Sequence, residues 1–383
     1  MSDPAAIRLP RALVPADGRF GSGPSKVRPE AVAALTDASR GLLGTSHRRD
    51  GVTSIVHALR ESLAELFGLA DSYEVVLGNG GATTFWDAAT FGLIERRSEH
   101  LVFGEFSSKF AAVTHAAPHL EDPIVIESAP GTHPDPVVDE RVDVYALTHN
   151  ETSTGVMMDI RRPAVDAEHG LVVVDATSAA GGLRVDPAEF DAYYFAPQKA
   201  FGSEGGLWFA LCSPAAIARI ERIAASDRWQ PPSLSLANGL ASSRRDETYN
   251  TPALATLFLM RHTTDWMLAN GGLEWAASRC DQSAEIVYGW AESRSFAEPF
   301  VAKPSERSRV TATIDFVTTV DAAAIATALR ANGIVDVEPY RKLGRNQLRI
   351  GMFPAVEPDD VATLTNAIDY IVDVLTGGVS AER

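Results

Sequence analysis

The pattern of hydrophobic and polar positions predicts alternating strands and helices through the first two thirds of the chain. One run, Leu171–Val174, is apolar at every position, as expected of a strand that is covered on both faces. Strands separated by helical segments favour a parallel sheet between two layers of helices. We therefore predict an α/β fold with a mainly parallel seven-stranded sheet and helices on both faces. The predicted strands are 73–77, 101–103, 124–126, 142–147, 171–174, 192–195 and 206–211.

The C-terminal third has a different pattern, in which strands and helices suggest a smaller α+β domain. A polar, proline-rich stretch comes before it, and we predict a long loop there. The remaining predicted elements are a helix from Pro29, a helix over 51–67, the loop over 226–251, helices over 252–269 and 273–294, a strand over 309–317, a helix over 321–332, a strand over 346–352 and a helix over 357–376. The predicted division is an N-terminal arm (1–16), a large domain (17–265) and a small C-terminal domain (266–383).

Composition narrows the class of protein. Hydrophobic residues make up 45% of the 383 positions and charged residues 22%, which is typical of a globular chain. The net charge of −16 disfavours general binding to nucleic acid or to anionic membranes. No run of 18 apolar residues predicts a membrane span. The two cysteines, Cys212 and Cys280, and the absence of a secretory signal pattern at the N-terminus fit a cytoplasmic protein.

Reactive or polar residues follow four of the predicted strands. Asp175 ends the strand 171–174, and Lys199 follows the strand 192–195. A glycine-rich turn, LGNGGATTFW, opens a helix, and Thr152 lies in the polar segment THNETSTG. Ligands bind beyond the carboxyl ends of strands in open α/β sheets. Each feature also has an ordinary alternative: a helix cap, a surface lysine, a simple glycine turn and a polar turn.

Taken together, these four features match the needs of pyridoxal 5'-phosphate. Backbone N–H groups at a helix start bind phosphate, and a carboxylate keeps the pyridine nitrogen protonated. The aldehyde needs a lysine amine, which Lys199 would supply. An aromatic side chain covers one face of the ring, and Phe106 follows the strand 101–103.

Several motifs in order resemble those of one enzyme family. They are FGSGPSKV, GTSHRR, GNGGATTFW, GEFSSKF, HNETSTGV, VDATSAAGG, FAPQKAFG and YNTP, spread over residues 20–252. The chain resembles the phosphoserine aminotransferases, a family of fold-type I, class V pyridoxal-phosphate enzymes, and its actinobacterial branch above all. Two positions depart from the family pattern: Phe106 stands where many members have tryptophan, and Thr83 where some have arginine.

The resemblance implies a role for each matching residue. Lys199 would bond to the cofactor and move the α-proton, Asp175 would pair with the ring nitrogen, and Phe106 would stack on the ring. The other implied cofactor contacts are Ala82, Thr83 and Gln198 at the phosphate, Thr152 at the ring hydroxyl, and Asn250 and Thr251 at the phosphate of a neighbouring subunit. The resemblance therefore also implies an obligate homodimer with composite sites.

A dense basic cluster, His47-Arg48-Arg49, stands out in this acidic chain. A solvated charge run is the alternative, but arginine grips carboxylate and phosphate groups with paired hydrogen bonds. The resemblance implies substrate contacts by Ser22, His47, Arg48, Arg49, Arg349, Arg341 and Lys342, with Arg349 at the α-carboxylate and with Arg341 and Lys342, together with Arg345, as phosphate contacts of the second subunit. The implied reaction is reversible transfer of an amino group from glutamate to 3-phosphohydroxypyruvate, which gives O-phospho-L-serine and 2-oxoglutarate in serine biosynthesis. Use of a phosphorylated threonine precursor in pyridoxine biosynthesis is left open.

Rival interpretations make different demands on the chain. Another class V aminotransferase would take a different anionic substrate, and a desulfurase would need a reactive cysteine on a mobile loop. A nucleotide-binding protein would use the glycine-rich turn, but the sequence lacks an acidic ribose contact at a credible place. No metal is expected, because His115 and His119 are four residues apart without an HExxH motif.

Overall fold

The computed structural model describes residues 3–166 and 169–377, and its main sheet contains the seven predicted strands. The strands are β1 (Glu74–Asn79), β2 (Ser98–Val102), β3 (Ile124–Glu127), β4 (Val144–Thr148), β7 (Leu171–Asp175), β8 (Ala192–Phe195) and β9 (Leu207–Cys212). Their order across the sheet is β1-β9-β8-β7-β4-β2-β3. Strand β9 runs antiparallel to β1 and β8, and the other pairs are parallel. The prediction of a mainly parallel sheet is confirmed.

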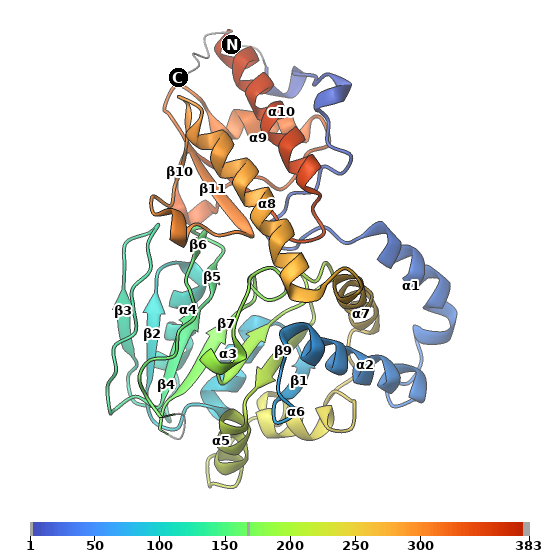
Figure 1. Cartoon of the computed structure of the whole chain (residues 1–383). Coiled ribbons are helices and arrows are strands. Elements are labelled where there is room, and N and C mark those ends of the chain that lie inside the picture. The colour runs from blue at the N-terminus through green and yellow to red at the C-terminus, as the bar shows by residue number, and fades with distance from the viewer. Residues whose placement is uncertain (1–2, 167–168, 378–383) are drawn as a thin grey trace.

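Helices cover both faces of this sheet (Figure 1). The helices before the C-terminal region are α1 (Pro29–Leu42), α2 (Asp50–Phe67), α3 (Ala82–Gly92), α4 (Glu105–His115), α5 (Pro214–Ala224), α6 (Leu236–Ser243), α7 (Leu254–Ala269) and α8 (Gly272–Glu292). Successive strand residues point to opposite faces, so Val172 and Val174 pack against α2, α7 and α8. Val173, between them, packs on the other face with α3, α4, α5 and α6. The fully apolar run therefore reflects burial on both sides.

A second, antiparallel sheet forms a separate core with the C-terminal helices. Its elements are β10 (Ala297–Pro299), β11 (Thr311–Phe316), α9 (Ala322–Arg330), β12 (Gln347–Gly351) and α10 (Pro358–Thr376). Helix α8 contributes to both cores, with Cys280 in the first and Val287 in the second. The predicted domain limits at residues 16 and 265 stay a prediction.

The N-terminal segment packs against this second core. Phe20 is fully buried there. Its N–H donates to the Val335 carbonyl at 3.3 Å, and its carbonyl accepts from the Gly351 N–H at 2.7 Å. A Cβ on Gly351 would lie 2.4 Å from the Gly21 carbonyl oxygen, so only glycine allows this close approach. This backbone pairing of Phe20 places residues 22–25 beside the main sheet, where they form hydrogen bonds with the loop after β8.

Some sequence-based element predictions were wrong. The stretch 226–251, predicted as a loop, contains the 3-10 helix Pro232–Leu234 and helix α6. Leu236 and Leu240 bury one face of α6, and the Ser235 hydroxyl caps it by accepting from the Asn238 N–H at 3.3 Å. Strand β10 and the hairpin of β5 (Asn150–Glu151) and β6 (Val156–Met157) were missed, because two or three residues carry no periodic signal. No helix in the described ranges is long and apolar enough to cross a membrane.

Candidate active site

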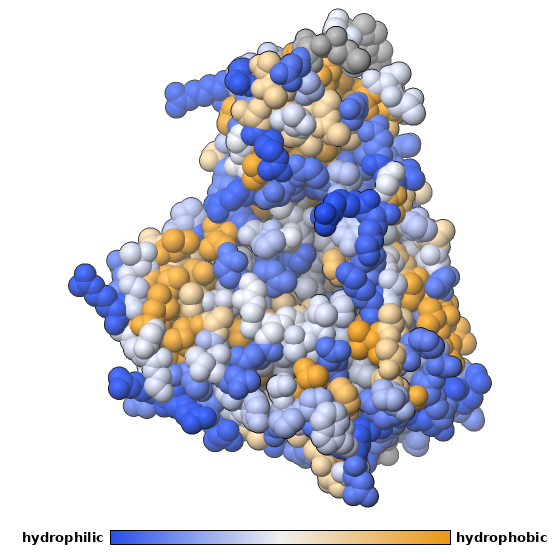
Figure 2. All heavy atoms as spheres, turned by 180° about the vertical axis from the view of Figure 1, so that it is seen from behind, coloured by the Kyte–Doolittle hydropathy of each residue, from blue (hydrophilic) through white to orange (hydrophobic). Residues whose placement is uncertain are grey.

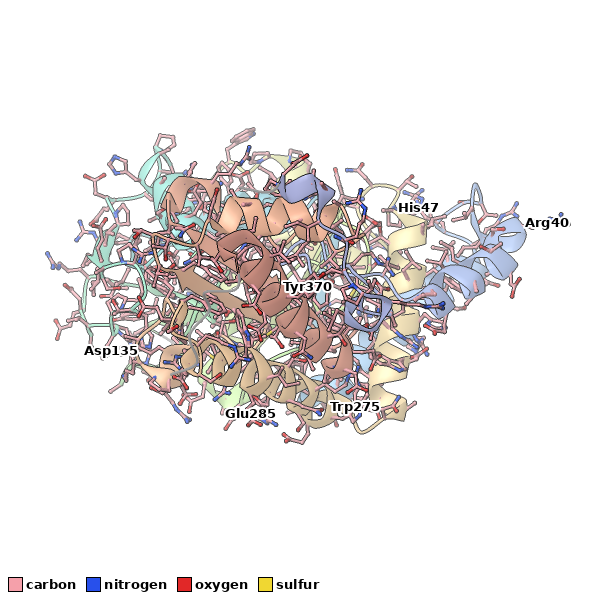
Figure 3. All side chains as sticks on the ribbon, turned by 90° about the horizontal axis from the view of Figure 1, so that it is seen from above. Arg40, His47, Asp135, Trp275, Glu285 and Tyr370 are labelled. Carbon is pink, nitrogen blue, oxygen red and sulfur yellow. The ribbon has the colours of Figure 1, made fainter. Side chains whose placement is uncertain are left out.

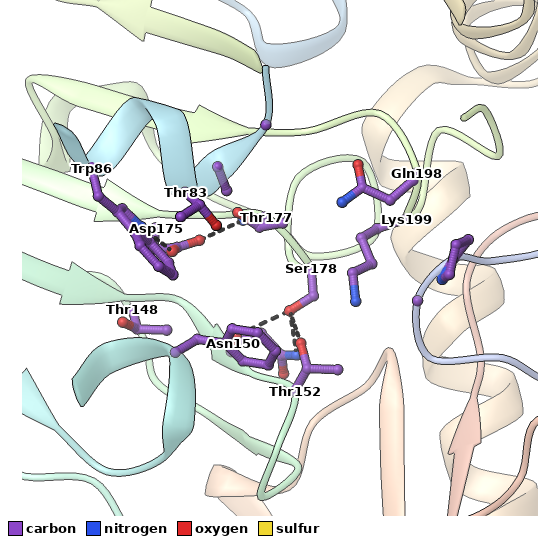
Figure 4. A pocket seen from close by; sticks show the side chains of 15 residues that line it. Thr83, Trp86, Thr148, Asn150, Thr152, Asp175, Thr177, Ser178, Gln198 and Lys199 are labelled. Carbon is purple, nitrogen blue, oxygen red and sulfur yellow. Dashed lines mark hydrogen bonds between the residues drawn. The ribbon is translucent and has the colours of Figure 1, made fainter. Parts of the chain in front are cut away.

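A cavity of about 350 Å³ lies at the carboxyl ends of the parallel strands, and it brings together the chemistry predicted there (Figure 4). In Figure 4, Lys199 points into the cavity from one side, and Asp175 and Trp86 lie across from it. The predicted cofactor residues that line the cavity are Ala82, Thr83, Phe106, Thr152, Asp175, Gln198 and Lys199. The sequence separation of Asp175 and Lys199 therefore corresponds to one parallel strand crossing, from β7 to β8.

The Asp175 carboxylate ends β7 and is held on both oxygens. Its Oδ2 accepts from the Tyr194 hydroxyl at 3.0 Å and lies 3.2 Å from the Trp86 indole Nε1. Its Oδ1 accepts from the Thr177 N–H at 2.9 Å. The residue is buried, so these donors compensate for lost hydration and fix the direction of the carboxylate. This anchored negative charge suits a cationic partner in the cavity.

The Lys199 amine donates to the Ser22 carbonyl oxygen at 2.6 Å. The loop around it is tied to the same segment, because the Ser25 N–H donates to the Gln198 carbonyl at 2.9 Å and the Ser25 hydroxyl to the Lys199 carbonyl. A Cβ on Gly23 would lie 1.8 Å from the Lys199 amine. Burial and the nearby positive charge of Arg349 lower the pKa of Lys199 to about 8, against the pull of Asp175 and Glu151.

This lowered pKa predicts how the chain reacts with an aldehyde. Only the neutral amine attacks a carbonyl, and the neutral fraction of Lys199 grows as pH rises through about 8. At neutral pH about one tenth of the amine would be neutral, against less than about one in a thousand for an ordinary lysine. Stopped-flow absorbance should show capture of pyridoxal phosphate speeding up to about pH 8 and then levelling off. A rate that keeps rising toward the ordinary lysine pKa would contradict this placement.

Unpartnered polar atoms inside the cavity indicate that a polar ligand belongs there. Among the described residues, Asn150 Oδ1, Thr177 Oγ1 and Gln198 Oε1 are buried without a hydrogen-bond partner, and all three side chains line the cavity. Each unmet buried polar group costs about 1–3 kcal/mol, so three around one space are best explained by a bound molecule that satisfies them. Helix α3 begins at Ala82, and its first N–H groups suit a phosphate. The residues present therefore fit pyridoxal phosphate.

Arg349 and Ser22 do not line the cavity themselves, but Arg349 contacts Thr152 and Ser22 contacts Lys199, which both line it. The Thr152 hydroxyl donates to Ser178 Oγ at 2.8 Å, and the Arg349 guanidinium lies 3.4 Å from the Thr152 carbonyl. The Arg349 Nε is buried without a partner, and burial lowers the pKa of this arginine. The Ser22 hydroxyl is also buried and unpartnered. Arg349 therefore keeps donors available for an anionic ligand.

The other predicted residues lie outside the cavity. His47 contacts Thr251, with Nδ1 3.3 Å from Oγ1, and Arg48 and Arg49 are exposed. Asn250 and Thr251 are tied by their backbone to the side chain of Asn79, at the end of β1. These residues form one patch, which we call the 47–49/250–251 patch.

Two of the predicted basic residues of the C-terminal domain lie elsewhere. Arg341 is exposed, and the Lys342 amine forms an ion pair with Glu105. The structure therefore does not bring either residue into the cavity that holds Lys199.

The sequence analysis missed several residues that shape the cavity. Trp86 and Tyr194 hold Asp175, and Ser178 joins Asn150 to Thr152. Trp86 lies in the motif GNGGATTFW and Ser178 in the motif VDATSAAGG, so the sequence indicates that both are near the site. Nothing local distinguishes a side chain that donates to a carboxylate from one that only packs.

Comparison with known proteins decides the family. The profile of the family described as Aminotransferase class-V matches residues 20–337. The chain belongs to this family. The predicted fold class, the transaminase chemistry and the cofactor class, pyridoxal phosphate, are thereby confirmed. The predicted role of each individual side chain stays a prediction.

Relatives of this class-V aminotransferase cover nearly its whole length. A protein of Mycolicibacterium paratuberculosis, provisionally assigned as a phosphoserine aminotransferase, is 59% identical over 98% of this chain and 100% of its own. The phosphoserine aminotransferase of Rhodococcus jostii is 55% identical over 96% of this chain and 98% of its own. These matches bear out the predicted resemblance to the actinobacterial branch.

Solved structures share the fold of this class-V aminotransferase. A phosphoserine aminotransferase from Cytophaga hutchinsonii has a TM-score of 0.82 and 24% identity, covering 92% of this chain and 99% of its own. A pyridoxamine-pyruvate aminotransferase from Mesorhizobium loti has a TM-score of 0.80 and 20% identity, with 95% of each chain covered. The fold is thus common to aminotransferases with different substrates, and it does not select one.

The rival chemistries find little support in the described residues. Cys212 ends β9 and Cys280 lies inside α8; both are buried, and burial raises the pKa of each thiol, the opposite of a reactive cysteine. His115 ends α4, and His119 lies beyond it, with Nε2 3.1 Å from the Thr90 carbonyl. The two histidines therefore do not share a helix face.

Proposed function

We propose that the chain is a phosphoserine aminotransferase, which converts glutamate and 3-phosphohydroxypyruvate to 2-oxoglutarate and O-phospho-L-serine. The observation that carries the proposal is the identity of 55% over nearly the full length to the Rhodococcus jostii enzyme of that name. The cavity supports it, because Lys199 and Asp175 lie on opposite sides of a space with unmet polar groups. Another class-V aminotransferase with a different anionic substrate is the alternative.

The side chains around the cavity have separable tasks in this reaction. When bound, pyridoxal phosphate supplies an electron-withdrawing ring that stabilises negative charge at the substrate Cα. Asp175 would keep the ring nitrogen protonated, and the start of α3 with Gln198 would hold the phosphate. The Lys199 amine, neutral in part near pH 8, takes a proton from Cα and returns it. Phe106 covers one face of the ring and excludes water.

Both amino-acid substrates carry an α-carboxylate and a second anionic group. Arg349, half-buried with a free Nε donor, is suited to the shared α-carboxylate. The exposed guanidinium groups of Arg48 and Arg49 lie outside the chain's own cavity, and in a composite site of two chains they are suited to the distal carboxylate or phosphate. Because both substrates are anionic at each end, one arginine-rich site can serve both halves of the reaction.

A coupled assay of 2-oxoglutarate release tests this function. Purified holoenzyme with glutamate should act on 3-phosphohydroxypyruvate with a kcat/KM at least about 100-fold above that on hydroxypyruvate, which lacks only the phosphate. Equal use of the two acceptors would contradict a phosphate-reading site and favour the alternative aminotransferase. The same assay with the phosphorylated threonine precursor decides whether the chain also serves pyridoxine biosynthesis.

We also propose that two chains form a homodimer with composite sites, in the cytoplasm. The 47–49/250–251 patch supports this, since two groups of predicted ligand contacts gather on one exposed surface outside the chain's own cavity. Exposed apolar side chains also favour association, and Trp229 and Leu43 are 73% and 42% exposed. Leu43 follows helix α1, which projects from the body of the molecule and carries Arg40 at its far end (Figure 3). Figure 2 shows that the surface seen from behind is mostly hydrophilic, with several separate groups of hydrophobic residues on it. Sedimentation velocity would measure the mass, and a fully active monomer would contradict the proposal.

A further inference from the structure

A buried carboxylate beside the cavity has no task in the function described so far. Glu151 lies on β5 between Asn150 and Thr152, and it is fully buried. Its Oε2 accepts hydrogen bonds from the N–H groups of Phe106 at 3.1 Å and Ser107 at 2.9 Å, and from the Ser107 hydroxyl at 3.0 Å. Its Oε1 accepts from the N–H and the hydroxyl of Ser153, at 3.2 and 2.7 Å. Every partner is a donor, as an ionised carboxylate requires.

These hydrogen bonds join two segments that are far apart in the sequence. One is the first turn of α4, which carries Phe106, and the other is the β5 turn, which carries Thr152. The Glu151 side chain packs closely against the backbone of Gly104, just before α4, because a Cβ on Gly104 would lie 2.3 Å from Glu151 Cγ. The start of a helix also favours a negative charge, because its N–H groups point toward it.

Burial makes the charged form of this carboxylate less favourable, and the hydrogen bonds offset part of that free-energy cost. Burial raises the pKa of Glu151, while the donors on Ser107 and Ser153 pull it down. The Phe106 ring itself is partly buried against the core cluster that contains Trp86 and Phe110, with the Tyr340 ring centre 6.1 Å away and the Lys109 amine 5.6 Å away. Glu151 therefore supplies buried hydrogen bonds to the backbone of the helix turn that carries Phe106, in addition to the packing of the ring.

We propose that Glu151 is a positioning residue that fixes the Phe106 ring over the cofactor by fastening the first turn of α4 to the β5 turn. The proposal rests on the proposed function, in which Phe106 covers the cofactor ring. Glu151 touches neither cofactor nor substrate in this role. In this role its effect on the affinity for the cofactor passes through the position of Phe106, and its charge acts separately on the pKa of the Lys199 amine.

A double-mutant cycle on cofactor affinity tests this dependence. The apo-enzyme forms of the wild type, Glu151→Gln, Phe106→Leu and the double variant are titrated with pyridoxal phosphate, and its dissociation constant is measured by equilibrium dialysis. Glutamine keeps the size of Glu151 but turns an N–H₂ group toward donors. We expect each single variant to weaken binding about 10-fold, and the double variant to lose no more than about 3-fold beyond Phe106→Leu.

A product of the two effects, near 100-fold, would overturn the proposal, because Glu151 would then act independently of Phe106. No effect of Glu151→Gln would overturn it as well. Glu127→Gln, the same change at an exposed position on β3, is the matched control and should leave affinity unchanged. If Glu151→Gln does not fold, Ser153→Ala takes its place in the cycle, since it removes one donor and keeps the carboxylate. A wild type that fails to bind pyridoxal phosphate would reject the proposed function instead.

Discussion

Replacing Lys199 by alanine is expected to lower kcat by at least about 10³-fold, because the base that moves the Cα proton is removed. The fold should survive. The main-chain contacts of Lys199, to the Ser25 hydroxyl and the Gly202 N–H, do not involve the side chain that is lost. Far-ultraviolet circular dichroism and thermal unfolding check the fold, and single-turnover kinetics with glutamate check the chemistry.

Two comparisons sharpen this experiment. Lys303→Ala removes an exposed lysine that pairs with Glu306 at 2.8 Å, and it should leave turnover unchanged. A small amine such as methylamine, added to the Lys199→Ala enzyme, should restore part of the proton transfer. Turnover near the wild-type rate in Lys199→Ala would reject the assignment of this residue.

The sequence was sufficient for the parts of the site that sit on single strands. Asp175 and Lys199 could be paired because a parallel crossing places the ends of β7 and β8 at the same sheet edge. The residues between them form a single strand–connection–strand unit, so the order of the elements along the chain was enough to predict that the two side chains lie close together.

Contacts between distant segments could not be predicted in the same way. The carbonyl of Ser22 reaches the Lys199 amine only because the N-terminal segment pairs with Val335 and Gly351 on the second core. The Tyr194 hydroxyl and the Trp86 indole reach Asp175 from different elements. No local pattern encodes such pairings. Helix α6 was also not predicted, because only Leu236 and Leu240 of its eight residues LANGLASS are large and apolar, and their burial depends on the sheet face that the helix covers.

Replacing Asp175 by asparagine should be the second most damaging change, since it removes the negative charge while keeping the shape. We expect kcat to fall by about 10²–10³-fold, as when one preorganised electrostatic group is lost from an active site. The carboxylate now receives donors on both oxygens, from Tyr194 and Thr177 among others. An asparagine N–H₂ group would face donors on either side, so cofactor affinity should also fall.

Tyr194→Phe separates the charge from its hydrogen bonds. It removes the hydroxyl that lies 3.0 Å from Asp175 Oδ2 but leaves the carboxylate, the Thr177 N–H and the Trp86 indole in place. If the negative charge opposite Lys199 is what matters, this variant should lose less in kcat than Asp175→Asn, because the charge and two of its donors remain although a hydrogen bond to a charged group, worth about 1.5–3 kcal/mol, is removed. Equal losses in Tyr194→Phe and Asp175→Asn would mean that orientation, and not charge, is the contribution of Asp175. An Asp175→Asn enzyme within about 3-fold of the wild type would exclude a carboxylate–pyridinium pair, because the ring would then need no anionic partner.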